Sequence, residues 1–138
     1  MTPETLAALH VRAFDRLRPW SAQEFSELLT SPHVFLCPGP HGFALGRAVA
    51  DEAELLTLAT DPAYRRQGHA RRCLDSFEIT AQERGAVQTL LEVDHQNQAA
   101  ISLYENAGYA ITATRPAYYT LRDGTRADAL LLTKSLHT

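Results

Sequence analysis

One stretch in the middle of the chain constrains the fold most, because its pattern changes from strand to helix and back to strand. Residues 54–60 are apolar or β-branched apart from Glu54, and the Asp-Pro pair that follows ends this strand. Residues 68–84 carry apolar side chains at helical spacing, and Gly85 suits the end of a helix. Residues 87–94 then predict a buried strand. This succession requires a sheet with at least one helix packed on its face.

The flanking segments add further helices and strands. Thr2 before Pro3 is a helix start, and Pro19 is expected to end that helix. Ser21 is placed to cap the next helix, and the Asp-Gly pair at 123–124 is typical of a hairpin. In chain order, these elements are helices at 3–17, 22–29 and 97–107 and strands at 33–37, 42–50, 109–120 and 125–135. The sequence therefore predicts an α/β fold with a mixed central sheet and helices on its faces.

Length and composition limit the functions that are possible. The 138 residues suffice for one core and leave no room for a second, so we expect a single domain over residues 1–138. The net charge of −3 and the lack of a long basic run argue against a nucleic-acid-binding protein. No run approaches about 18 apolar residues, and the first residues do not form a signal peptide, so we expect neither membrane insertion nor export.

The cysteines and histidines argue against a metal site. Cys37 and Cys73 are far apart and lack CxxC spacing, and the six histidines form no HxH or HxxxH pair. Two unpaired cysteines suit a reducing compartment. We therefore expect a cytoplasmic protein that binds no metal, with both cysteines in the core.

The loop before the long helix is the strongest candidate for a binding site. It reads Tyr-Arg-Arg-Gln-Gly-His-Ala-Arg-Arg from residue 64 to residue 72. A helix N-terminus offers unpaired N–H groups, Gly68 and Ala70 let a ligand approach the backbone, and arginine binds phosphate. The loop therefore predicts a pyrophosphate site, although the same residues would also suit a solvated, basic start of a helix. It contains neither a P-loop nor a GxGxxG dinucleotide motif.

The pattern Arg65-x-x-Gly68-x-Ala70 resembles the acetyl-CoA motif of the GCN5-related N-acetyltransferases (GNAT), and it stands at the strand-to-helix junction that the motif requires. Within that superfamily, the chain is most similar to the bacterial ribosomal-protein-alanine N-acetyltransferases, the RimI type. The other matching parts are Pro19-Trp20-Ser21, Leu91-Glu92-Val93, Asn97, Ala100-Ile101, Leu103-Tyr104-Glu105, Gly108-Tyr109, Tyr118-Tyr119 and Asp128-Ala129. Each part is common, but their order and spacing together are specific.

This resemblance implies the GNAT fold, with acetyl-CoA as the co-substrate and two neighbouring strands that splay apart to admit its pantetheine arm. Backbone groups at the end of one of these strands would bind the acetyl and pantetheine amides, as an added strand would. Asn97 would bond to the cofactor, cap its helix, or do both. The implied cofactor-binding residues are Leu58, Ala59, Thr60, Arg66, Gln67, Gly68, His69, Ala70, Arg71 and Asn97.

The resemblance also implies the catalytic residues. An amine that attacks a thioester must be neutral, and the departing thiolate must gain a proton. Glu92 would be the base, through a water, and Tyr104 the acid. Without the family pattern, Glu92 would be a salt-bridged carboxylate at a strand end and Tyr104 a core tyrosine. Glu52 and Glu54 lie where some relatives carry the base, and Glu54 is the second candidate.

The implied reaction is acetylation of a primary amine, first of all the N-terminal alanine of a ribosomal protein or a similar peptide N-terminus. Two alternatives stay open, which are a small-molecule amine as the acceptor and a non-catalytic acyl-CoA-binding sensor. The chain departs from the family pattern in two places. Thr2-Pro3 leaves no length for a strand before the first helix, so we expect the first strand to be missing or very short. Pro116-Ala117 stands where relatives often carry basic and amide residues.

Overall fold

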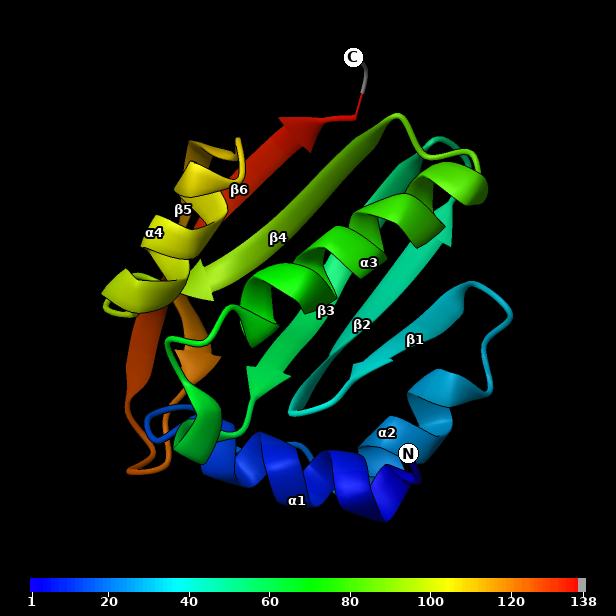
Figure 1. Cartoon of the computed structure of the whole chain (residues 1–138). Helices are drawn as coiled ribbons and strands as arrows, with labels where there is room; N and C mark the ends of the chain where they lie inside the picture. Colours follow the sequence, from blue (N-terminus) through cyan, green and yellow to red (C-terminus); the bar gives the residue numbers. More distant parts are fainter. Residues whose placement is uncertain (137–138) are drawn as a thin grey trace.

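A computed structural model describes residues 1–136 of the chain, and a six-stranded sheet runs through its centre (Figure 1). The strands are β1 Val34–Gly39, β2 Gly42–Val49, β3 Glu52–Thr60, β4 Gln88–Asp94, β5 Ala110–Thr120 and β6 Arg126–Ser135. Their spatial order is β1-β2-β3-β4-β6-β5. The β3 and β4 strands pair in parallel and all other neighbours pair antiparallel, so the sheet is mixed as predicted.

Helices cover both faces of this sheet, which confirms the predicted fold class. The helical elements are α1 Pro3–Ala13, α2 Ala22–Leu29, the short 3-10 turn η1 Pro62–Tyr64, α3 His69–Glu83 and α4 Gln98–Asn106. In Figure 1, α3 crosses in front of the sheet and α1 and α2 lie together at its lower edge. Side chains of α3 and α4 share one hydrophobic core with the sheet, and those of α1 and α2 form another.

Strand β2 shows how one sheet supplies two cores. Its side chains alternate between the faces, as in any strand. Ala44 packs in the core of α3 and α4, whereas Phe43 and Leu45 pack in the core of α1 and α2. Because both faces are buried at this strand, its sequence is almost continuously apolar.

A β-bulge interrupts β3. Leu56 is an extra residue of β3 that has no counterpart in β2. Because of this residue, Leu55 and Leu58 both pack on the side of α3, although they are three residues apart. A bulge bends its strand and increases the local twist. The bulge therefore turns the last residues of β3 away from the direction of its first half.

The strands β3 and β4 separate at the same place. Their last residue pair is Leu55 with Leu91. Beyond that pair, residues 56–60 of β3 and 92–94 of β4 do not pair with each other, and the ends of the two strands diverge in Figure 1. This separation is the splay that the family resemblance implied.

The first helix is shorter than predicted. It ends at Ala13, whereas the apolar spacing predicted a helix up to Leu17. The guanidinium of Arg122, in the turn between β5 and β6, donates to the carbonyl oxygens of Val11, Phe14 and Leu17. These contacts satisfy carbonyl groups at the helix end, so a tertiary interaction overrides the local spacing.

The other predicted elements are confirmed with small shifts at their ends. Thr2 and Ser21 cap α1 and α2, each in a capping box. Among residues 1–136 the first strand follows α2, in line with the prediction that the strand before the first helix is missing or very short. Cys37 and Cys73 are both buried, as predicted.

Candidate active site

The loop between β3 and α3 presents backbone N–H groups at the start of a long helix. Gly68 is the N-cap residue, with a φ of 82°, and it offers no side chain to cap the first turn. Arg66 is also left-handed, with a φ of 63°. The N–H groups of His69, Ala70 and Arg71 find no backbone acceptor in the described part of the chain. Unpaired N–H groups and the helix dipole favour an anion here.

The arginines of this loop differ in how far they are already paired. Arg65 donates to the carbonyl oxygen of Ala13 at 2.8 Å and so ties the loop to the end of α1. Arg71 pairs with Asp75, one turn further along α3, at 3.0 Å. Arg66 makes no hydrogen bond or ion pair with any other residue of 1–136. Arg66 is therefore the cation most available to a phosphate.

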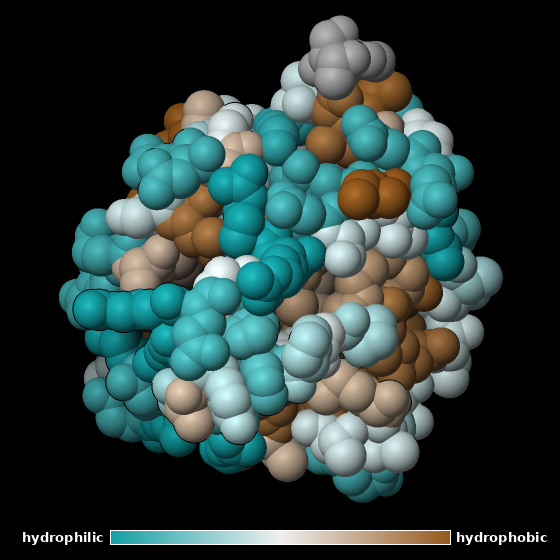
Figure 2. All heavy atoms as spheres, in the orientation of Figure 1, coloured by the Kyte–Doolittle hydropathy of each residue, from teal (hydrophilic) through white to brown (hydrophobic). Residues whose placement is uncertain are grey.

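Gln67 and His69 lie on either side of the N-cap glycine. Arg72 donates to the carbonyl oxygen of Gln67 at 3.4 Å and lies 3.3 Å from Nδ1 of His69. Burial, together with the charges of His41 and Arg72, lowers the pKa of His69. This shift favours the neutral imidazole, in which Nδ1 can accept from Arg72. Figure 2 shows hydrophilic side chains gathered around the start of α3, as an anion site requires.

The cofactor-binding residues predicted on β3 and α4 are placed around the splay. Leu58, Ala59 and Thr60 lie beyond the last β3–β4 pair, so their backbone groups on that edge are free to pair with an extended ligand. The Oδ1 atom of Asn97 accepts from the N–H of Ala100 at 3.2 Å, which confirms the helix cap. The amide nitrogen of Asn97 has no partner among the described residues and is available as a donor. These groups fit a pantetheine chain with its two amides.

Glu92 is the first residue of β4 beyond the last pair with β3. Leu91 and Val93 pack in the core of α3 and α4, so the alternation of the strand directs Glu92 to the opposite face. Its side chain is 11% exposed, and Oε1 accepts from Nη1 of Arg115 at 2.8 Å. The other oxygen, Oε2, is buried and has no hydrogen-bond partner in the described chain. A bound water or amine would satisfy it.

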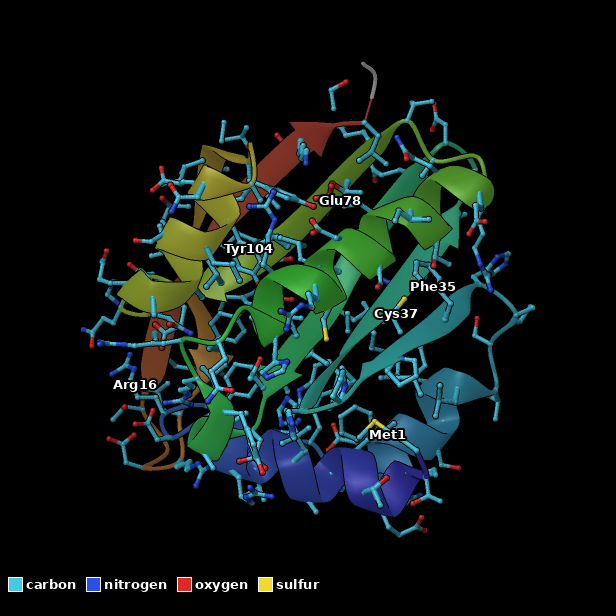
Figure 3. The ribbon with its side chains drawn as sticks, in the orientation of Figure 1. Met1, Arg16, Phe35, Cys37, Glu78 and Tyr104 are labelled. Atoms are coloured by element: carbon cyan, nitrogen blue, oxygen red, sulfur yellow. The ribbon has the colours of Figure 1, made fainter. Side chains whose placement is uncertain are left out.

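Tyr104 lies on the other face of the sheet. It is 7% exposed, packs in the core of α3 and α4, and projects from α4 toward α3 in Figure 3. Its ring meets that of Tyr109 edge-on at 5.9 Å. Burial raises the pKa of Tyr104, so the hydroxyl keeps its proton at neutral pH. A protonated hydroxyl in this position suits a proton donor.

The two alternative bases lie on β3, before the strands part. Glu54 is on the same face of the sheet as Glu92, pairs with Arg47 at 3.1 Å and is 30% exposed. Glu52 is exposed at the start of β3, beside Gln88, at the end of the strand away from the splay. Of the three carboxylates, only that of Glu92 follows the point of separation.

Three residues that the sequence analysis did not assign to the site surround Glu92. Arg115 pairs with Glu92, and its guanidinium lies 4.9 Å from the ring centre of Tyr118. Burial, followed by the negative charge of Glu92, raises the pKa of both Tyr118 and Tyr119. The sequence indicates the Tyr-Tyr pair only as part of the family pattern. Its proximity to Glu92 depends on how β5 is placed, which no sequence spacing reveals.

A splayed pair of parallel strands, with an anion-binding helix start beside it, defines a protein that binds an acyl-CoA thioester between its strands. Comparison with known proteins agrees with this class. The sequence model of the Acetyltransferase (GNAT) family matches residues 6–109. The chain therefore belongs to the GNAT family, and it is an N-acetyltransferase that uses acetyl-CoA as its co-substrate.

Individual relatives give a more detailed comparison. The chain is 34% identical to the ribosomal protein bS18-alanine N-acetyltransferase of Escherichia coli over 135 residues, which covers 95% of this chain and 90% of the relative. It is 34% identical to the N-alpha-acetyltransferase RimI of Mycobacterium tuberculosis over 122 residues, covering 82% and 75% of the two chains.

Solved structures agree on the fold. The crystal structure of the Escherichia coli alanine N-acetyltransferase superposes with a TM-score of 0.82 at 31% identity, covering 96% of this chain and 86% of that one. Ard1 from Thermoplasma volcanium gives the same TM-score at 23% identity and covers 100% and 95% of the two chains. The second likeness concerns the fold alone.

Two further observations concern metals and membranes. Within residues 1–136, no three His, Cys, Asp or Glu side chains are grouped so that they could hold a metal ion. No helix in the described part of the chain is long and apolar enough to span a membrane.

Proposed function

We propose that the acceptor is a peptide α-amine, first of all the N-terminal alanine of the ribosomal protein bS18. The observation that carries this proposal is the match to the bS18-alanine N-acetyltransferase of Escherichia coli over 95% of this chain. The matched span of the chain runs through Glu92, Tyr104 and the Tyr118-Tyr119 pair. The bacterial ribosomal acceptor would place the enzyme in the cytoplasm, which two free cysteines also favour.

In the proposed mechanism, Glu92 accepts a proton from the acceptor amine, directly or through a water bound at Oε2. The nitrogen forms a bond to the acetyl carbon, the carbon–sulfur bond breaks, and Tyr104 gives its proton to the departing thiolate. Base and acid lie on opposite faces of the sheet, so the amine and the thioester approach each other through the opening between β3 and β4. General acid–base help of this kind contributes about 10²- to 10⁴-fold in rate.

The proton affinity of the acceptor supports an α-amine. At cytoplasmic pH an α-amine with a pKa near 8 is neutral in roughly a quarter of molecules, whereas a lysine amine is neutral in about one in a thousand. One oxygen of Glu92 is already paired with Arg115 at 2.8 Å, which leaves Oε2 for the amine or its water. An amine that is often neutral needs little help from a base.

The experiment uses three acceptors with purified enzyme and acetyl-CoA. The first is a peptide that begins with alanine and contains one internal lysine, the second is the same peptide with a blocked N-terminus, and the third is a small polyamine. Thiol release is followed beside peptide mass. We expect a mass gain on the free peptide alone, in step with thiol release. Turnover of the polyamine without the peptide would instead favour a small-molecule acceptor.

A non-catalytic sensor gives a different result. It would bind acetyl-CoA in a calorimeter and release no thiol with any of the three acceptors. The proposal predicts binding together with turnover of the free peptide. Binding without turnover of any of these acceptors would therefore overturn it.

A further inference from the structure

An ion pair ties the irregular segment after α1 to the end of β4. Arg16 donates from Nε to Oδ2 of Asp94 at 2.8 Å and from Nη2 to Oδ1 at 3.3 Å. Asp94 is 4% exposed, while the side chain of Arg16 is 37% exposed. Figure 3 shows Arg16 on the side of the molecule where β5 and β6 lie. Such a two-pronged contact fixes both the distance and the orientation of the two groups.

The surroundings of Asp94 favour the ionised form of its carboxylate. Burial alone would raise the pKa of Asp94, but the hydrogen bonds from Arg16 and from the N–H of Gln96 lower it below its ordinary value. An unpaired buried carboxylate would be strongly unfavourable. The ion pair with the buried carboxylate of Asp94 therefore stabilises the position of Arg16.

The same segment is anchored a second time, to the turn between β5 and β6. Leu17 forms an isolated β-bridge with Leu121. The N–H of Arg122 donates to the carbonyl oxygen of Arg16 at 3.0 Å. The N–H of Arg18 donates to the carbonyl oxygen of Thr120 at 3.1 Å. Residues 14–18 thus join the β5–β6 hairpin on one side and β4 on the other.

The position of Asp94 gives this anchor a functional meaning. Asp94 is two residues beyond Glu92 on the same strand, so both side chains leave the same face of β4. That face is the one from which the acceptor amine reaches Glu92 in the proposed function. The segment held by Arg16 therefore borders the approach to the base.

We infer that Arg16 and Asp94 are a positioning pair for the acceptor, which hold residues 14–18 in place as a wall of the acceptor channel. This inference rests on the proposed function, because it takes the face of Glu92 as the acceptor side. Neither residue touches the cofactor loop at residues 64–72, and Asp94→Asn keeps an acceptor for the N–H of Gln96 beside Asn97, so acetyl-CoA binding depends on the pair less than acceptor binding does. A displacement of the wall weakens acceptor binding first.

The test compares Asp94→Asn and Arg16→Gln with the double variant, with the alanine-starting peptide as acceptor. Asparagine keeps the size of the side chain and an acceptor for the Gln96 N–H, so folding is preserved while the charge is lost. We expect each single variant to raise KM for the peptide about tenfold, in the range by which small displacements affect catalysis, with kcat changed less. The double variant loses no more than either single one, because the two residues act as a unit.

A matched control removes a neighbouring ion pair that does not reach β4. Glu24→Gln breaks the exposed pair of Arg18 with Glu24 from the side of α2, outside residues 14–18, and KM for the peptide is expected to stay within about twofold. The dissociation constant of acetyl-CoA, measured by calorimetry, is expected to change less than KM for the peptide in every variant. An unchanged KM in Asp94→Asn, or an equal loss of acetyl-CoA affinity, overturns the inference. Failure of the wild-type enzyme to acetylate any peptide overturns the proposed function instead.

Discussion

Glu92 and Tyr104 lie on opposite faces of the sheet, where β4 leaves its partner β3. Neighbours of Glu92 in β4 pack in the core that contains Tyr104, so Glu92 itself points the other way. The last β3–β4 pair precedes Glu92 by one residue. A base and an acid separated by an opening in the sheet match a reaction in which two substrates meet from two sides.

Tyr104→Phe removes the proposed acid and keeps the ring. We expect kcat to fall about 10²-fold or more, because the thiolate then leaves without a proton from the enzyme. The affinity for acetyl-CoA, measured by calorimetry, is expected to stay the same.

Tyr109→Phe is the matched control for this variant. The hydroxyl of Tyr109 accepts from Thr89 and donates to Glu78, so its loss leaves buried polar groups unpaired. Tyr109→Phe is expected to lower the free energy of unfolding by about 1–3 kcal/mol, with little change in kcat. Equal kcat values for the two variants would contradict the assignment of Tyr104.

Gly68→Ala tests the anion site at the start of α3. A Cβ at this position meets nothing closer than 3.9 Å, but the φ of 82° strains any residue other than glycine. Gly85 has a φ of 95° and open space around it, so Gly85→Ala carries the same kind of strain far from the loop. Both variants are expected to lose about 1–2 kcal/mol of stability in urea unfolding.

The two glycine variants are expected to differ in cofactor binding. In Gly68→Ala, relief of the strain shifts the N–H groups that face the pyrophosphate, and calorimetry is expected to show about tenfold weaker acetyl-CoA binding, or roughly 1.4 kcal/mol. Gly85→Ala binds acetyl-CoA as the wild type does. Equal affinities in both variants would argue against a phosphate site at this loop.

Gly46→Ala tests the packing of α3 against the sheet. An added Cβ would lie 2.6 Å from Phe35 and from Phe77, whose rings stack with centroids 5.8 Å apart. We expect a loss of about 1–3 kcal/mol in the free energy of unfolding, measured in urea, because neither ring is free to move away in a filled core. Wild-type stability of this variant would show that the two rings are loosely packed.

His10 gives the stability a defined pH dependence. It is 2% exposed, accepts from the N–H of Trp20, and burial lowers its pKa from 6.5 to about 4. Between these two values the unfolded chain binds a proton that the folded chain does not. Stability is therefore complete above pH 6.5 and falls as the pH drops toward 4, by an amount on the order of 3 kcal/mol.

Urea unfolding of wild type and His10→Gln between pH 4.5 and 7.5 measures this effect. The pair of Glu24 and Arg18 lowers the pKa of Glu24 to about 2, so that group loses its contribution only below 4.5. The difference between the two proteins above pH 4.5 thus isolates His10. Identical slopes in the two proteins would mean that the folded state accepts a proton on His10.

Local patterns were sufficient to predict most of the fold and the cofactor loop. Gly68 and the caps at Thr2, Ser21 and Asn97 are local features, so their residue types were informative. The bulge at Leu56 was not predictable, because residues 55–59 are almost all apolar and their order does not show which residue lacks a partner in β2.

Contacts between distant segments escaped the sequence analysis as well. Arg16 and Asp94 are 78 positions apart, and Arg115 and Glu92 meet across β6, which lies between β5 and β4 in the sheet. Arg122 reaches back over more than a hundred residues to the end of α1. Residue type alone does not distinguish these arginines from those at the cofactor loop.

The most direct test of the account compares Glu92→Gln with Glu54→Gln in peptide acetylation at saturating acetyl-CoA. Both changes keep the size of the side chain, and both residues pair with an arginine on the same face of the sheet. We predict that Glu92→Gln lowers kcat/KM about 10²-fold or more and that Glu54→Gln lowers it less than about threefold. A large loss in Glu54→Gln with near-normal turnover in Glu92→Gln would contradict the account and move the base to β3.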